Sequence, residues 1–102
     1  MKKIYYDKNA DKELAEFSIS VQKVFLSLIN ILKTTGKLEF PVTKKLEKNL
    51  YEIRVKLQGE FRGFYAYMGK EFIVILHFFH KKTQKTPLKN LKTAKRRLKQ
   101  YE

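Results

Sequence analysis

The chain has 102 residues and a formal net charge of +13, from 23 Lys and Arg against 10 Asp and Glu. This length suits one modest core, so we expect residues 1–102 to form a single domain. The excess of positive charge predicts a polyanionic partner, which is a nucleic acid, an anionic membrane or an acidic protein. The absence of cysteine excludes disulfides, thiolate metal sites and cysteine nucleophiles, and two histidines make a poor metal site. We therefore expect no metal and no other cofactor.

No apolar run approaches the roughly 18 residues of a membrane span. The N-terminal stretch MKKIYYDKNADKE carries acidic residues where a signal peptide has its apolar region. These two features predict a cytoplasmic protein.

The N-terminal part of the chain predicts one strand and two helices. KKIYY at residues 2–6 is β-branched and aromatic, and Asp7 after it suits a helix N-cap. Residues 7–34 predict a helical hairpin, with a short polar helix and then a longer one from Ser18 that ends at Gly36. The apolar side chains of the longer helix recur every three or four residues: Ile19, Val21, Val24, Phe25, Leu28, Ile29 and Leu32.

Three apolar runs predict an antiparallel meander: LYEIRVKL at 50–57, EFRGFYAYM at 60–68 and EFIVILHFFH at 71–80. Tight turns at Gln58-Gly59 and Gly69-Lys70 separate them. In the first run, Glu52, Arg54 and Lys56 alternate with apolar residues, as in a half-buried strand. We expect the N-terminal strand to join the edge of this three-stranded sheet.

A final basic helix is predicted from Thr86 as N-cap and Pro87 as first helical residue. Its apolar stripe comprises Leu88, Leu91, Ala94, Leu98 and Tyr101. The remaining positions are mostly Lys or Arg, which suits contact with RNA phosphates, docking of an acidic protein, or a solvated surface. The element order is β, α, α, β, β, β, α, which predicts an α+β fold built as one layer pair.

Several motifs together resemble the RelE/ParE toxin superfamily, and within it the phage-derived, HigB-like branch. They are LYEIR at 50–54, FRGFYAY at 61–67, IVILHFFHKKTQKTP at 73–87, and the basic helix with Ala94 and Arg97. The resemblance implies one RelE-like toxin domain over residues 1–102, from a type II toxin–antitoxin system. It also implies a ribosome-dependent mRNA endoribonuclease that inhibits translation. The implied partners are the ribosome, mRNA and a HigA-like helix-turn-helix antitoxin.

Metal-free RNA cleavage requires attack of the ribose 2'-OH on phosphorus, with a cyclic phosphate as the expected product. The site must stabilise charge on the phosphate oxygens and assist proton transfer. With the resemblance, this chemistry assigns candidate catalytic residues: Arg54, Arg62, His77, Lys81 and Lys82. Candidate RNA-binding residues are Lys56, His80, Thr83, Gln84, Lys85 and Arg97.

Structural alternatives exist for these residues. We expect Arg54 and Arg62 on one open face, where loss of a charge costs roughly 0 to 1 kcal/mol. Arg54 is alternatively an ordinary solvated charge paired with Glu52. His77 is expected to share a face with Ile75 and Phe79, either as a hydrogen-bonded, partly buried residue or as an acid or base.

The aromatic residues Tyr65 and Tyr67 either belong to the core, which we prefer, or stack on a base. His80 departs from the family pattern, so its replacement is expected to matter least. Two alternative functions stay open for the chain as a whole. One is a toxin of the same fold that poisons a DNA topoisomerase by binding, and the other is a non-enzymatic nucleic-acid-binding module.

Overall fold

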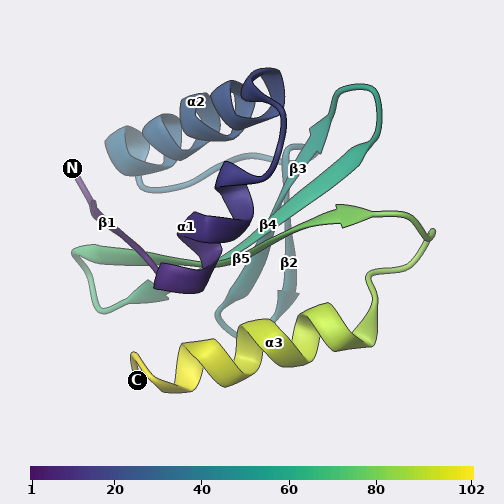
Figure 1. The fold of residues 1–102 in the computed structure, drawn as a ribbon. Coiled ribbons are helices and arrows are strands. Elements are labelled where there is room, and N and C mark those ends of the chain that lie inside the picture. Colours follow the sequence, from purple (N-terminus) through teal and green to yellow (C-terminus); the bar gives the residue numbers. More distant parts are fainter.

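A computed structural model describes all of residues 1–102 and contains a five-stranded mixed sheet with helices on both faces (Figure 1). In chain order the elements are β1 (Lys3–Tyr6), α1 (Lys8–Ala15), α2 (Ile19–Thr35), β2 (Thr43–Glu47), β3 (Leu50–Lys56), β4 (Glu60–Met68), β5 (Phe72–Lys81) and α3 (Leu88–Lys99). The strand order is β1-β5-β4-β3-β2. β1 runs parallel to β5, and every other pair is antiparallel. The predicted edge position of the N-terminal strand is confirmed.

The ends of the first two helices follow from local capping. The Asp7 side chain accepts a hydrogen bond from the backbone N–H of Asn9 at 2.8 Å, and Ser18 caps α2 through the N–H of Val21 at 3.2 Å. Gly36 ends α2 in the left-handed region, with φ of 86°. Both predicted helices are confirmed, and each packs on the sheet, α1 against β5 and α2 against β3.

The predicted three-stranded meander is incomplete, because a fourth strand, β2, pairs with β3 at the edge of the sheet. Its sequence TKKLE has no apolar run, and Lys44 and Lys45 are exposed. Lysines on an edge strand discourage pairing with another protein's sheet, so an edge position tolerates this polar sequence. Asn49, with φ of 54°, turns the chain into β3 and donates from Nδ2 to the Tyr67 carbonyl at 2.7 Å.

Two separate cores make the molecule a three-layer structure, which corrects the predicted single layer pair. The first core lies between the sheet and α1 with α2, and includes Phe25, Tyr65 and Phe78. The second lies between the opposite face and α3, and includes Phe64 and Leu98. Figure 1 shows α1 and α2 on one side of the sheet and α3 on the other.

The start of α3 differs from the prediction by one residue. Pro87 takes the N-cap position without a side-chain cap, and the helix begins at Leu88. Thr86 is therefore not the N-cap. Leu88 is 71% exposed, so the buried stripe of α3 begins at Leu91.

A bulge between β4 and β5 changes which face His77 occupies. Ile75 lies opposite Tyr65 and His77 lies opposite Phe64, so β5 has one extra residue between these pairs. Ile75 belongs to the first core, whereas His77 stacks on Phe79 on the α3 side. The prediction that His77 shares a face with Phe79 is confirmed, and the prediction that it shares one with Ile75 is wrong.

The two tyrosines of β4 are structural. Tyr65 is 1% exposed in the first core, and burial raises its pKa to about 12. Tyr67 packs against the same core and donates its hydroxyl proton to the Gly36 carbonyl at 2.8 Å. The preferred assignment of both residues to the core is confirmed.

None of the helices combines the length and the apolar character that crossing a membrane requires.

Candidate functional site

Arg54 and Arg62 lie directly opposite each other on β3 and β4, and we call them the arginine pair. Side chains alternate along a strand, so Arg62 shares the face of Phe64, which packs in the second core under α3. Two guanidinium groups therefore lie side by side on the α3 face of the sheet. This is the juxtaposition that the sequence predicted.

The arginine pair is more buried and more neutralised than expected. Arg62 is 6% exposed, so its predicted open exposure is wrong. Its Nη2 donates to Glu60 Oε1 at 3.1 Å, and its Nε lies 3.9 Å from Glu52 Oε2. Arg54 Nε donates to Glu52 Oε1 at 2.9 Å, which confirms the pairing with the residue two positions earlier. Glu52 itself is 2% exposed, so the pair is not a solvated one.

A basic segment at the end of β5 is connected to the arginine pair through Glu60. We call residues 81–85, which are the last residue of β5 and the four that follow it, the lysine loop. Lys81 is opposite Glu60 across the strands, and Lys81, Lys82, Thr83, Gln84 and Glu60 line an open hollow of ≈ 550 Å³. Glu60 thus contacts Arg62 on one side and borders the lysine loop on the other. The structure thus gathers four predicted residues of this loop around Glu60, the residue that contacts Arg62.

Two other predicted residues flank this hollow. Lys56 is 87% exposed in its side chain and lies 3.9 Å from Glu60 Oε2. Lys85 is exposed, and its carbonyl accepts a hydrogen bond from the Thr83 hydroxyl at 2.7 Å. Both charged groups are accessible to an anionic ligand.

His80 faces away from the arginine pair. It lies opposite Phe61 and stacks on that ring at 4.5 Å with an interplanar angle of 14°. Phe61 packs against the first core, on the α1 and α2 side of the sheet. The sheet therefore separates His80 from Arg54 and Arg62.

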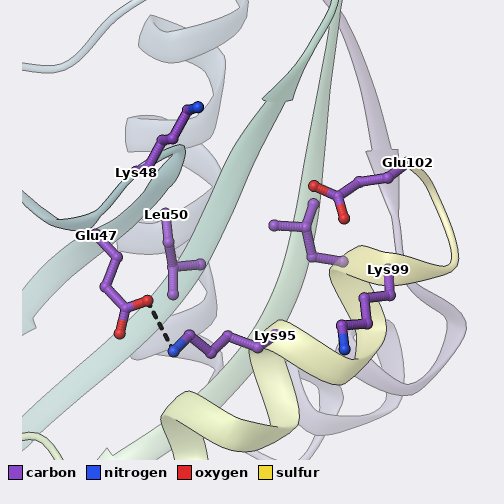
Figure 2. A pocket seen from close by; sticks show the side chains of 7 residues that line it. Glu47, Lys48, Leu50, Lys95, Lys99 and Glu102 are labelled. Carbon is purple, nitrogen blue, oxygen red and sulfur yellow. Dashed lines mark ion pairs between the residues drawn. The ribbon is translucent and has the colours of Figure 1, made fainter.

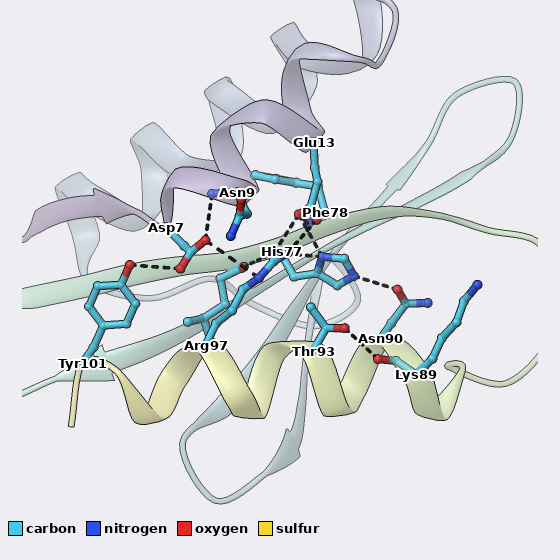
Figure 3. A network of polar contacts seen from close by, with 11 residues as sticks. Asp7, Asn9, Glu13, His77, Phe78, Lys89, Asn90, Thr93, Arg97 and Tyr101 are labelled. Carbon is cyan, nitrogen blue, oxygen red and sulfur yellow. Dashed lines mark hydrogen bonds and ion pairs between the residues drawn. The ribbon is translucent and has the colours of Figure 1, made fainter.

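His77 and Arg97 belong to a buried polar network that joins α3 to α1 and β5 (Figure 3). His77 Nδ1 lies 2.8 Å from Glu13 Oε1, and its Nε2 lies 2.6 Å from Asn90 Oδ1. Arg97 donates to both oxygens of Glu13 at 3.0 Å and to the Leu76 carbonyl at 2.9 Å. Both ring nitrogens of His77 are thus occupied by protein groups. The roles of His77 in catalysis and of Arg97 in RNA binding stay predictions.

The same network extends to the end of α3. The Tyr101 hydroxyl donates to Asp7 Oδ2 at 3.0 Å, and Arg97 Nε lies 3.8 Å from Asp7 Oδ1. Asp7 is 2% exposed and also caps α1. One carboxylate therefore connects the start of α1 with the last turn of α3.

The network sets a pH dependence for the stability of the fold. Burial alone would raise the pKa of Glu13, but hydrogen bonds from His77, Arg97 and the Phe78 N–H outweigh it and lower the pKa from 4.5 to about 2. A lowered folded-state pKa stabilises the fold above the unfolded-state pKa, and this contribution is lost as the pH falls towards the folded-state pKa. The difference in unfolding free energy between wild type and Glu13→Gln should be constant above pH about 5 and shrink between about 4.5 and 2. Urea unfolding at several pH values measures it, and a constant difference down to pH about 3 would contradict this assignment.

An exposed ion pair fastens α3 to the edge of the sheet. Lys95 Nζ lies 2.8 Å from Glu47 Oε1, and the pair borders a hollow of ≈ 300 Å³ between α3 and the turn after β2 (Figure 2).

No group of three or more His, Cys, Asp or Glu side chains is placed to hold a metal ion.

The acidic and amide partners of the basic residues were not predicted as site residues. Glu52 had a usable signal, because strand alternation places it on the face of Arg54. Glu60 opens β4 and lies two residues before Arg62, which is the same signal. The sequence carries no such signal for Glu13 and Asn90, because they contact His77 from 64 and 13 residues away along the chain.

Comparison with solved structures defines the class of fold. A double arginine-to-alanine mutant of E. coli toxin RelE in the free state matches with a TM-score of 0.70 and 12% identity, over 99% of this chain and 98% of that chain. Isolated E. coli RelE toxin in the P21 form gives 0.68 and 12%, over 90% and 97%. The RelB–RelE antitoxin–toxin complex from Methanococcus jannaschii gives 0.62 and 22%, over 74% and 88%. The chain has the RelE toxin fold.

The family follows from the sequence of the chain. A family model described as phage derived protein Gp49-like (DUF891) matches residues 12–99. The chain belongs to this phage-derived Gp49-like family, and its fold is the RelE toxin fold that its motifs indicated. No curated protein sequence matches the chain.

Proposed function

We propose that residues 1–102 form the single toxin domain of a type II toxin–antitoxin system, and that it cleaves mRNA on the ribosome without a metal ion. The observation that carries this proposal is the arginine pair, which Glu60 links to the lysine loop. Guanidinium groups remain charged and bind phosphate in a bidentate manner, which suits the charge that develops on phosphorus oxygens. The RelE fold of the chain supports the same function.

In the proposed reaction the ribose 2'-OH attacks the adjacent phosphorus, and the bond to the 5'-oxygen breaks. The products are a cyclic phosphate and a 5'-hydroxyl, with one proton leaving the 2'-OH and one reaching the 5'-oxygen. Arg54 and Arg62 stabilise the charge on the non-bridging oxygens. Lys81 and Lys82 lie where they can supply further positive charge and donate a proton.

In the free protein, the Glu60 carboxylate occupies the position next to Arg62 that we propose for the RNA phosphate. It accepts a hydrogen bond from Arg62 Nη2 and is partly exposed, with 39% of its side chain accessible. An RNA phosphate that enters the hollow competes with this carboxylate for Arg62. The competition favours a substrate that the ribosome already holds in position, because a bound, oriented phosphate has a high effective concentration.

The distribution of charge supports the proposed partners. Lys56, Thr83, Gln84 and Lys85 border or flank the hollow and are exposed, so they contact the RNA backbone on either side of the cleaved bond. A HigA-like helix-turn-helix antitoxin is the proposed inhibitor, and a RelE relative is described in complex with the antitoxin RelB. The proposed place of action is the cytoplasm, where the ribosomes are.

Induced expression tests the proposed function. In a bacterial host we expect growth and translation to stop within minutes, and messages to be cut only while they are translated. Purified protein should cut ribosome-bound message in EDTA, with the ribosomes kept intact by polyamine. DNA breaks and a damage response that precede any cleavage of messages would favour the topoisomerase poison instead. Binding of RNA without cleavage or toxicity would favour the nucleic-acid-binding module.

A further inference from the structure

Glu52 occupies an unusual position between the two guanidinium groups. It lies on β3 two residues before Arg54 and diagonally across from Arg62 on β4. With 2% exposure it is as buried as Asp7 and more buried than any other acidic residue. Burying a carboxylate costs free energy unless cations compensate it. The two arginines supply that compensation, so the position of Glu52 depends on them and theirs on Glu52.

The contacts of Glu52 involve the same atom of both arginines. Oε1 accepts from Arg54 Nε at 2.9 Å, and Oε2 lies 3.9 Å from Arg62 Nε. Oε2 and Arg62 Nε are the two buried side-chain polar atoms that have no hydrogen-bond partner. A shift of about one ångström by Arg62 would bring them to ordinary hydrogen-bond distance. The carboxylate of Glu52 thus lies on the Nε side of both guanidinium groups.

The Nη groups of Arg54, and Nη2 of Arg62 once Glu60 is displaced, remain for a ligand. Arg54 makes no side-chain hydrogen bond other than the one from Nε, so both of its Nη groups are free of protein partners. Arg62 donates from Nη1 to the Phe61 carbonyl and from Nη2 to the displaceable Glu60. When a phosphate replaces Glu60, Glu52 is the carboxylate that still faces both arginines, with a hydrogen bond to Arg54 and an ion pair at 3.9 Å with Arg62.

From this geometry we infer that Glu52 is the positioning residue of the arginine pair. It fixes the two guanidinium planes through Nε, so that their Nη edges point to one phosphate. This inference rests on the proposed function, because it assigns Glu52 to the same cleavage reaction. Glu52 does not touch the RNA and acts through Arg54 and Arg62.

Glu52→Gln tests the inference by separating kcat from KM. We expect kcat on ribosome-bound message to fall about 10- to 100-fold, the scale of a misplaced catalytic group. We expect KM to change less than about two-fold, because the exposed lysines that bind RNA are intact. Glu52→Asp, which keeps the charge, should recover part of kcat. Glu39→Gln removes an equal charge from an exposed pair with Lys37 and should leave both constants unchanged.

A double-mutant cycle and an NMR measurement exclude a merely structural effect. The Glu52→Gln loss should shrink on the Arg54→Ala background, because part of the group it positions is gone. The Nε–H signals of Arg54 and Arg62 in ¹⁵N spectra should exchange slowly with water in wild type and faster in Glu52→Gln. If Glu52→Gln does not fold, Glu52→Asp should show the lowered kcat and the faster exchange at a near-native melting temperature.

The outcomes separate this inference from the proposed function. A folded Glu52→Gln protein with wild-type kcat and unchanged Nε–H exchange would overturn the positioning role, even if the wild type cleaves message. A wild type without ribosome-dependent cleavage, whose Nε–H exchange still depends on Glu52, would overturn the proposed function while supporting the role of Glu52 in holding the arginines.

Discussion

Arg62→Ala should lower the rate of cleavage of ribosome-bound message by about two orders of magnitude or more, the scale of losing one pre-organised donor to a transition state. Arg62 is the member of the arginine pair that contacts two carboxylates: its Nε lies 3.9 Å from Glu52 Oε2, and its Nη2 lies 3.1 Å from Glu60 Oε1. Arg62→Lys should recover only part of the rate, because an ammonium group cannot form the bidentate contact. The measurement is single-turnover cleavage of a defined message on purified ribosomes. Arg54→Ala should behave similarly, and His80→Ala should have the smallest effect.

The burial of Arg62 changes what this variant does to stability. At 6% exposure its removal leaves Glu52 Oε2 beside an empty space, so we expect a loss of about 1 to 3 kcal/mol rather than the loss of an open-face charge. Assays therefore belong well below the melting temperature of the variant. Lys23→Ala, an exposed charge on α2, is the control for net charge. Folded Arg62→Ala and Arg54→Ala proteins that remain fully toxic would show that the active face lies elsewhere.

Arg97→Ala should destabilise the fold by about 3 kcal/mol, because it removes one partner of a largely buried ion pair. Arg97 is 12% exposed in its side chain, and its loss leaves Glu13 and Asp7 without their cationic partner. Urea unfolding followed by circular dichroism measures the change. Arg96→Ala, at the exposed neighbouring position, should change stability by less than about 0.5 kcal/mol.

The same pair of variants decides what Arg97 is for. A structural Arg97 predicts lower stability with RNA binding intact at low temperature. An Arg97 that contacts RNA would leave stability near wild type and weaken binding with a reduced salt dependence, which would contradict the network as its main role.

Local signals predicted most of the elements of this fold. Asp7, Ser18 and Gly36 act within two to four residues of themselves, and strand alternation from Leu50 to Lys56 depends only on the nearest neighbours. β2 escaped prediction because its stability comes from pairing with β3 and not from its own polar sequence. The face of His77 escaped because a bulge depends on the register of two strands.

The candidate site was predictable only in its basic half. Alternation placed Arg54 and Arg62 on one face, and the family motif indicated the lysine loop. Arg62 is buried beside Phe79, its neighbour on β5, and near the acidic residues Glu52 and Glu60. The strong excess of basic residues gave no indication of these acidic partners. Arg97 lies in a run of Lys and Arg, and only the tertiary contact with Glu13, 84 residues away, distinguishes it from Arg96.

The polar network also has a consequence for the order in which the molecule forms. Tyr101 reaches Asp7 across 94 residues, and β1 finds its strand partner only in β5. Closing such long loops costs chain entropy before the contacts compensate it, so we expect the local turns of α1 and α2 to form before the network and the β1–β5 pairing. α3 supplies one side of the second core, so we expect this core to form only after α3 has docked on the sheet.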